Sequence, residues 1–240
     1  MNFIKKRWMQ SRWIGNTPMK EGELLRKSTQ QGLVMGMRLA VLEEQSAAVI
    51  VNGHLANVFL TGAYQLERDK MPLLQPDQKH NWLFPVELYF INMAVTTPHP
   101  WQPSTPLLTR DTERGLVQLL MSGSYTAQVD NPTMFMQVMV LQNGFYDWPS
   151  IHRYLQAHLN DAAVSLIISQ SIPLASLAKI KEKSGRILRE DVNWRLNGSG
   201  LCLRELSVET LEIHPTMQRL LAEQQDYLDF NRARMHSIVG

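Results

Sequence analysis

The stretch from Met37 to Glu67 most constrains how this 240-residue chain can fold. It holds two runs rich in Val, Leu, Ile and Ala, separated by Asn52-Gly53. An Asn-Gly pair readily adopts the positive φ angles of a tight turn, so the stretch predicts a β-hairpin. Because Ala48–Val51 is apolar at every position, we expect the first strand to be covered on both faces.

Three later stretches also have the apolar pattern of strands: 82–95, 116–129 and 201–213. Within the second, Gly123 lies on the same face of the strand as the apolar residues. A glycine there predicts a close approach of another backbone. Within the third, the apolar residues change parity, which predicts a β-bulge or a change of packing face.

Four helices are predicted from proline starts and apolar spacing. They begin at Pro132 (running through Met139), near Pro149, at Pro173 and at Pro215 (running to about Met235). Strands therefore come first, then helices, then one strand and one helix. This order predicts an α+β protein: a mixed or antiparallel N-terminal β-rich region packed on helices, followed by a strand and a C-terminal helix.

Composition indicates an ordinary globular protein, with 44% hydrophobic and 19% charged residues and a net charge of +2. Cys202 is the only cysteine, which excludes an intrachain disulfide and fits a reducing compartment. No uncharged apolar run reaches the length of a spanning helix, and the N-terminus lacks the apolar core of a signal peptide. We therefore expect a cytoplasmic location, with any membrane contact peripheral, on the inner face of the plasma membrane.

The first residues mix basic and large apolar side chains without any acid. Three interpretations stay open: a leader that is flexible or packs on its own domain, a segment that binds an anionic membrane surface, and a segment that binds nucleic acid. The candidate membrane-binding residues are Phe3, Ile4, Lys5, Lys6, Arg7, Trp8, Arg12 and Trp13.

Motifs for catalysis are missing from the sequence. There is no G-x-S-x-G elbow, no phosphate-binding glycine loop and no H-E-x-x-H, and one cysteine cannot build a structural zinc site. The acidic pairs Glu43-Glu44 and Asp111/Glu113 are expected to be solvated or salt-bridged. Outside the leader the chain is slightly acidic, which argues against nucleic acid. We therefore predict no catalytic residues, no metal and no cofactor, and a protein that works by binding.

Several segments, in their order, resemble one protein family. They are the E-x-Q element Glu43–Gln45 within 37–51, GHLANVFLTGAYQLE from Gly53 to Glu67, MPLL at Met71–Leu74, VELYFIN at Val86–Asn92, the run Thr105–Phe135, and LRELSVETLEIHPTM at Leu203–Met217. Together they resemble the SPFH (Band 7) superfamily of stomatins, prohibitins and flotillins. The similarity is greatest to a bacterial branch of stand-alone, virion-core-protein-like members.

The resemblance implies a domain organisation and a function. Residues 1–34 are the basic leader and connection, 35–214 the SPFH-like domain, and 215–240 a C-terminal helix. The implied function is a non-catalytic homo-oligomeric scaffold, peripheral on the bacterial inner membrane, that recruits or organises membrane-stress proteins. The alternatives are a soluble oligomeric adaptor without membrane contact and, more remotely, an enzyme with a site assembled from distant residues.

The final helix is the candidate surface for self-association, with packing on its own domain as the competing interpretation. Apolar residues recur along it at helical spacing. The predicted interface residues are Met217, Leu220, Leu221, Tyr227 and Leu228.

Overall fold

The computed structural model describes residues 13–14, 17–30, 32–33, 36–67, 84–111, 114–170 and 176–239. The chain divides into two compact units, each assembled from three separate stretches of sequence. Unit 1 comprises 1–97, 127–154 and 196–204, and unit 2 comprises 98–126, 155–195 and 205–240.

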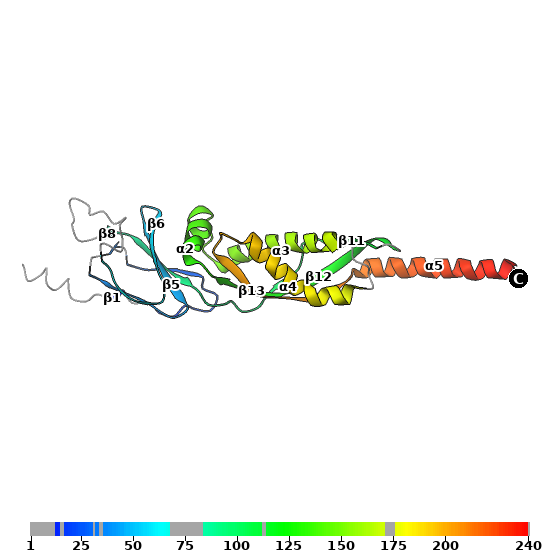
Figure 1. Ribbon diagram of the computed structural model, residues 1–240, viewed down its shortest axis with the longest axis horizontal. Coiled ribbons are helices and arrows are strands. Elements are labelled where there is room, and N and C mark those ends of the chain that lie inside the picture. Colours follow the sequence, from blue (N-terminus) through cyan, green and yellow to red (C-terminus); the bar gives the residue numbers. More distant parts are fainter. Residues whose placement is uncertain are drawn as a thin grey trace, which may run out of the picture. The chain divides into compact units, whose positions relative to one another are not determined.

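The order of elements confirms the predicted α+β class (Figure 1). The first strands are β1 (Trp13–Ile14), β2 (Leu25–Lys27), β3 (Gly32–Leu33), β4 (Arg38–Val41), β5 (Gln45–Val51), β6 (His54–Phe59), β7 (Gly62–Gln65), β8 (Phe84–Pro85) and β9 (Glu87–Asn92). There follow β10 (His99–Trp101), β11 (Leu107–Asp111), β12 (Gly115–Val129), α2 (Pro132–Met134), η2 (Phe135–Gln142), α3 (Trp148–Gln170), α4 (Leu177–Arg195), β13 (Leu201–Ile213) and α5 (Pro215–Val239).

The predicted hairpin is confirmed as β5 and β6, which pair antiparallel in unit 1. Its turn residues Asn52 and Gly53 have φ angles of 50° and 78°, the left-handed values that this dipeptide favours. β5 lies between β6 and β9 in a four-stranded sheet of order β2-β9-β5-β6. As expected, β5 is buried on both faces, from Gln45 through Ile50.

A second pair of strands encloses this hairpin in the sequence. β4 and β7 pair antiparallel, and β1 adds to β4 as a parallel strand, giving the order β1-β4-β7. The side chains of these strands join those of β5 and β9 in one apolar core. Its buried members are Ile14, Leu33, Met37, Leu39, Val41, Ala47, Val49, Phe59, Leu66, Val86, Leu88 and Phe90.

The helix predicted after Asn131 starts where expected but differs in type. The Asn131 side chain caps α2 by accepting a hydrogen bond from Met134 N at 3.1 Å, and Pro132 occupies the first turn. After one turn the backbone changes to η2, a π-helix of eight residues. The predicted short helix through Met139 is therefore confirmed, but most of it has the wider hydrogen bonds of a π-helix and it continues to Gln142.

Unit 2 is built around the long strand β12. β10 and β11 pair antiparallel with it, and β13 pairs with it as well. A Cβ on Gly123 would lie 1.9 Å from the Ser207 carbonyl oxygen, which confirms the close backbone approach predicted at this glycine. In β13, Leu206 and Val208 are half-buried on one parity and Leu211 is buried on the other, in agreement with the predicted change of packing face.

α4 spans Leu177–Arg195, and the start predicted at Pro173 lies outside the described residues and stays a prediction. α5 begins at Pro215 as predicted but continues to Val239, beyond the expected end near Met235. It projects from the end of β13 as one continuous helix (Figure 1). No helix in the described part of the chain has the length and hydrophobicity that a membrane span requires.

Candidate functional site

Trp13 and Ile14, the first described residues of the N-terminal leader, form β1 and pair with β4. Trp13 pairs with Arg38 and Ile14 with Leu39 on β4. Ile14 is buried in the core, whereas Trp13 is 47% exposed and its ring centroid lies 5.5 Å from the guanidinium carbon of Arg38. This separation is typical of a cation–π contact. An aromatic ring and a positive charge are therefore presented together at the surface.

Trp13 is the one predicted membrane-binding residue that the structure describes. The other seven lie outside the described residues: Phe3, Ile4, Lys5, Lys6, Arg7, Trp8 and Arg12. Arg38 was missed in the sequence because it lies 25 positions after Trp13, and only the pairing of β1 with β4 brings the two together.

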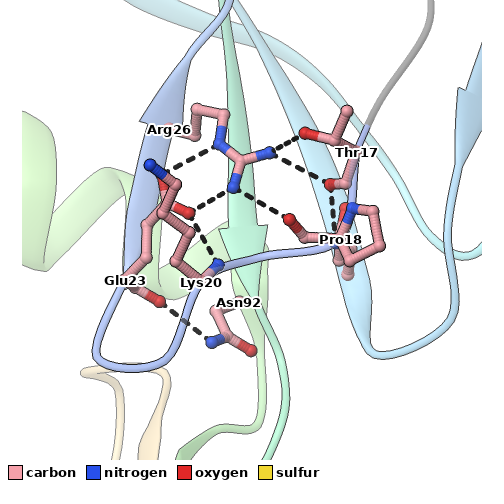
Figure 2. Close-up of polar contacts among 7 residues, drawn as sticks. Thr17, Pro18, Lys20, Glu23, Arg26 and Asn92 are labelled. Atoms are coloured by element: carbon pink, nitrogen blue, oxygen red, sulfur yellow. Dashed lines mark hydrogen bonds and ion pairs between the residues drawn. The ribbon is translucent and has the colours of Figure 1, made fainter.

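Arg26, on β2, holds the chain that follows β1 (Figure 2). All five of its guanidinium N–H groups have acceptors. Nη1 donates to the Thr17 carbonyl at 3.0 Å and the Thr17 hydroxyl at 2.5 Å, and Nη2 donates to the Pro18 carbonyl at 3.0 Å. Nε and Nη2 donate to the two carboxylate oxygens of Glu23, Nε at 2.8 Å. This two-point geometry is the one in which Arg binds carboxylates most strongly.

The same network reaches the four-stranded sheet through two amide side chains. Asn92 Nδ2 donates to the Glu23 carbonyl at 2.9 Å, and Gln45 Nε2 donates to the Thr17 carbonyl at 3.3 Å. The Lys20 backbone N–H also donates to the Glu23 carboxylate, at 2.9 Å. The hydrogen bonds from Arg26, followed by that of Lys20, lower the pKa of Glu23 from 4.5 to about 2. The segment after β1 is therefore held by side chains of β2, β5 and β9.

The predicted interface residues of α5 do not share one environment. Leu220 is 54% exposed and Tyr227 67% exposed, whereas Met217 and Leu221 are half-buried. Leu221 lines a groove of about 420 Å³ with Arg114 and Ile213 of the same unit. The backbone of Leu228 belongs to α5, but its side chain lies outside the described residues. Of the four whose side chains are described, Leu220 and Tyr227 are exposed, whereas Met217 and Leu221 are half-buried.

Phe230 is an exposed aromatic residue that the sequence analysis missed. It is 65% exposed and lies three residues after Tyr227 on α5, so the two rings project from neighbouring positions of the helix. The spacing of three was the available signal. Phe230 lies outside the apolar stripe that starts at Met217, so that stripe does not predict it.

Two titratable side chains of the described residues have contacts within the fold. Burial lowers the pKa of the half-buried His158; the charge of Asp161 opposes this shift, and the charge of Arg195 adds to it. Asp111 accepts a hydrogen bond from Arg114 N at 2.9 Å, a turn contact at the β11–β12 hairpin. No group of three or more His, Cys, Asp or Glu side chains with metal-binding geometry occurs among the described residues.

Trp13 on β1 and Leu220, Tyr227 and Phe230 on α5 are among the large apolar side chains that the described residues expose. The model of the SPFH domain-Band 7 family matches residues 26–227, and the chain belongs to this family. A comparison with characterised proteins finds no match. Membership in this family indicates a role of the membrane-associated scaffold type. The members of the family are generally non-catalytic.

Proposed function

We propose that this protein is a non-catalytic homo-oligomeric scaffold that binds the inner face of the bacterial plasma membrane peripherally and organises membrane-stress proteins there. Family membership across residues 26–227 is the observation that carries the proposal. Two features of the chain support it: the exposed Trp13–Arg38 pair at the end of a basic leader, and the exposed apolar residues of α5.

Weak attachment of one protomer is sufficient if many protomers act together. A basic residue near an anionic leaflet contributes on the order of 1 kcal/mol. The leader carries four such residues, Lys5, Lys6, Arg7 and Arg12. An oligomer that presents several leaders gains avidity through effective concentration, so each contact can remain weak while the assembly stays bound.

The proposal predicts that removing the leader weakens binding to anionic vesicles. Because Ile14 is buried in the core, the variant should delete residues 1–12 and carry Trp13→Ser, leaving Ile14 in place. Losing four basic residues at about 1 kcal/mol each should lower the affinity for phosphatidylserine vesicles, measured by co-sedimentation, by about a thousandfold. Neutral phosphatidylcholine vesicles are the control. Equal binding before and after the deletion would contradict membrane attachment through the leader and favour the soluble adaptor.

Self-association through α5 is a separate prediction. Replacing Leu220 and Tyr227 by Glu places charge on the exposed apolar positions, which should reduce the oligomer mass measured by light scattering. We expect an apparent dissociation constant at least about tenfold higher. Gln218→Glu, at an exposed polar position of the same helix, is the matched control and should leave the mass unchanged. An unaltered mass in the double variant would show that these two residues are not in a subunit contact.

A further inference from the structure

His214 is the residue between the last strand, β13, and the last helix, α5. Its backbone N–H donates to the Gln118 carbonyl on β12 at 2.8 Å, and its own carbonyl accepts from Gln218 N at 3.0 Å. Its side chain takes part as well, because Nδ1 accepts a hydrogen bond from Thr216 N at 3.3 Å. His214 is therefore the N-cap of α5, and its imidazole provides an acceptor for one of the N–H groups that a helix start leaves free.

The first two turns of α5 hold this helix on unit 2. Gln218 and Leu221 line the groove that they share with Arg114 and Ile213. Leu221 is half-buried, and every later residue of α5 whose side chain is described is exposed. The cap and the groove therefore set the direction in which α5 leaves the unit.

The cap works only while the imidazole is neutral. Nδ1 can accept a hydrogen bond when the single ring proton is on Nε2, whereas a protonated ring has a donor at both nitrogens. Protonation would turn Nδ1 of His214 into a donor that faces the Thr216 N–H. It would also place a positive charge at the positive end of the helix dipole. Histidine side chains in general gain this proton as the pH falls from 8 to 5.

Most of the charged groups that flank the cap are positive. The nearest ones along the neighbouring elements are Arg110 and Asp111 on β11, Arg114 before Gln118, Glu212 on β13 and Arg219 on α5. The three arginines oppose a further positive charge on the ring. Asp111 is buried and accepts a hydrogen bond from Arg114 N. Glu212 is exposed and can attract a charged imidazole, but this attraction does not give back the acceptor that Thr216 N loses.

We propose that His214 is a pH-sensitive cap, which holds the start of α5 while its imidazole is neutral and releases it on protonation. The neutral ring stabilises the first turn, so this contribution is complete above the range in which histidine titrates and is lost as the pH falls through it. Release leaves α5 joined to β13 through a frayed turn, from which the helix can take other directions. The cap requires neither a membrane nor a second copy, so it is independent of the proposed function.

Amide hydrogen exchange of the full-length chain tests the cap, with each rate corrected for the pH dependence of exchange in unstructured peptides. From pH 8 to about pH 5, the protection of the Thr216 and Gln218 amides should fall about tenfold, the combined effect of losing a cap and adding a positive charge at a helix start. His214→Asn should keep its protection over this range, because asparagine caps a helix without titrating. His214→Ala, which has no acceptor, should show low protection throughout.

His54→Asn is the matched control, because His54 is exposed on β6 of unit 1. This substitution should leave the pH response of Thr216 unchanged. A wild-type protection of Thr216 that does not vary with pH would overturn the proposal. An equal loss of protection in His214→Asn would overturn it too, since acid would then act on another group. Neither measurement involves vesicles or subunit mass, so a negative result leaves the proposed function intact.

Discussion

Replacing Gly123 by Ala is expected to destabilise unit 2 by at least about 3 kcal/mol, because the added methyl group has no space. It would lie 1.9 Å from the Ser207 carbonyl oxygen on β13 and 3.1 Å from Trp101 Nε1. The indole N–H of Trp101 donates to that same carbonyl at 3.3 Å, and Trp101 is the register partner of Gly123 on β10. Both obstacles are therefore fixed parts of the sheet, and β13 must move away from β12 to admit the methyl group.

Urea unfolding followed by circular dichroism measures the effect, with Gly198→Ala as the matched control. Gly198 has open space around its Cβ position but a φ of 87°, so alanine there should cost only about 1 kcal/mol of backbone strain. A Cβ on Gly185 would lie 2.6 Å from the Leu206 carbonyl, so Gly185→Ala should fall between the two. A Gly123→Ala chain as stable as the Gly198→Ala chain would show that β12 and β13 do not approach as closely as described.

Elements set by neighbouring residues were predictable from the sequence, because their determinants are local. Asn52-Gly53 specifies its turn through backbone preference, and Asn131-Pro132 specifies a helix start through capping. Gly123 was predictable from parity alone, since a glycine on the apolar face of a strand leaves room for a backbone. The sequence did not allow us to predict that this backbone belongs to β13, because Ser207 lies more than 80 positions further along the chain.

The π-helix and the Arg26 network had no comparable local signal. Phe135, Met136, Met139 and Val140 are all buried, a spacing that fits an α-helix as well as the π-helix that forms. Arg26 binds acceptors before it in the sequence, and Glu23 in turn binds Asn92, which is 69 positions away. Sequence periodicity does not report contacts between segments so far apart.

The candidate surfaces were predictable in part. Apolar spacing identified α5, but exposure separates Leu220 and Tyr227 from the half-buried Met217 and Leu221. For α4, the close contact of Gly185 with Leu206 on β13 identifies the covered face of the helix, which apolar spacing alone does not.

Replacing Arg26 by Met is expected to lower the free energy of unfolding at pH 7 by about 2 kcal/mol. The substitution keeps an apolar stem of similar length but removes five hydrogen-bond donors. It leaves the Glu23 carboxylate and the carbonyls of Thr17 and Pro18 without those donors. The side chains of Arg26 and Glu23 are each 23% exposed, so water compensates only partly. Arg186→Met is the control, because its contact with Glu190 is exposed and should be worth less than about 0.5 kcal/mol.

The pH dependence of this difference follows from the pKa of Glu23. Its carboxyl group has a pKa of about 2 in the folded chain against an ordinary value of 4.5, so the folded state favours the ionised form. The resulting stabilisation is complete above pH 4.5 and is lost as the pH falls toward 2. Unfolding measured from pH 7 to 2.5 should therefore show a constant gap between wild type and Arg26→Met near neutrality, and a narrowing gap below pH 4.5. A gap that stays constant or widens in acid would mean that the ion pair with Glu23 is not what Arg26 contributes. The backbone acceptors Thr17 and Pro18 would then account for the stabilisation.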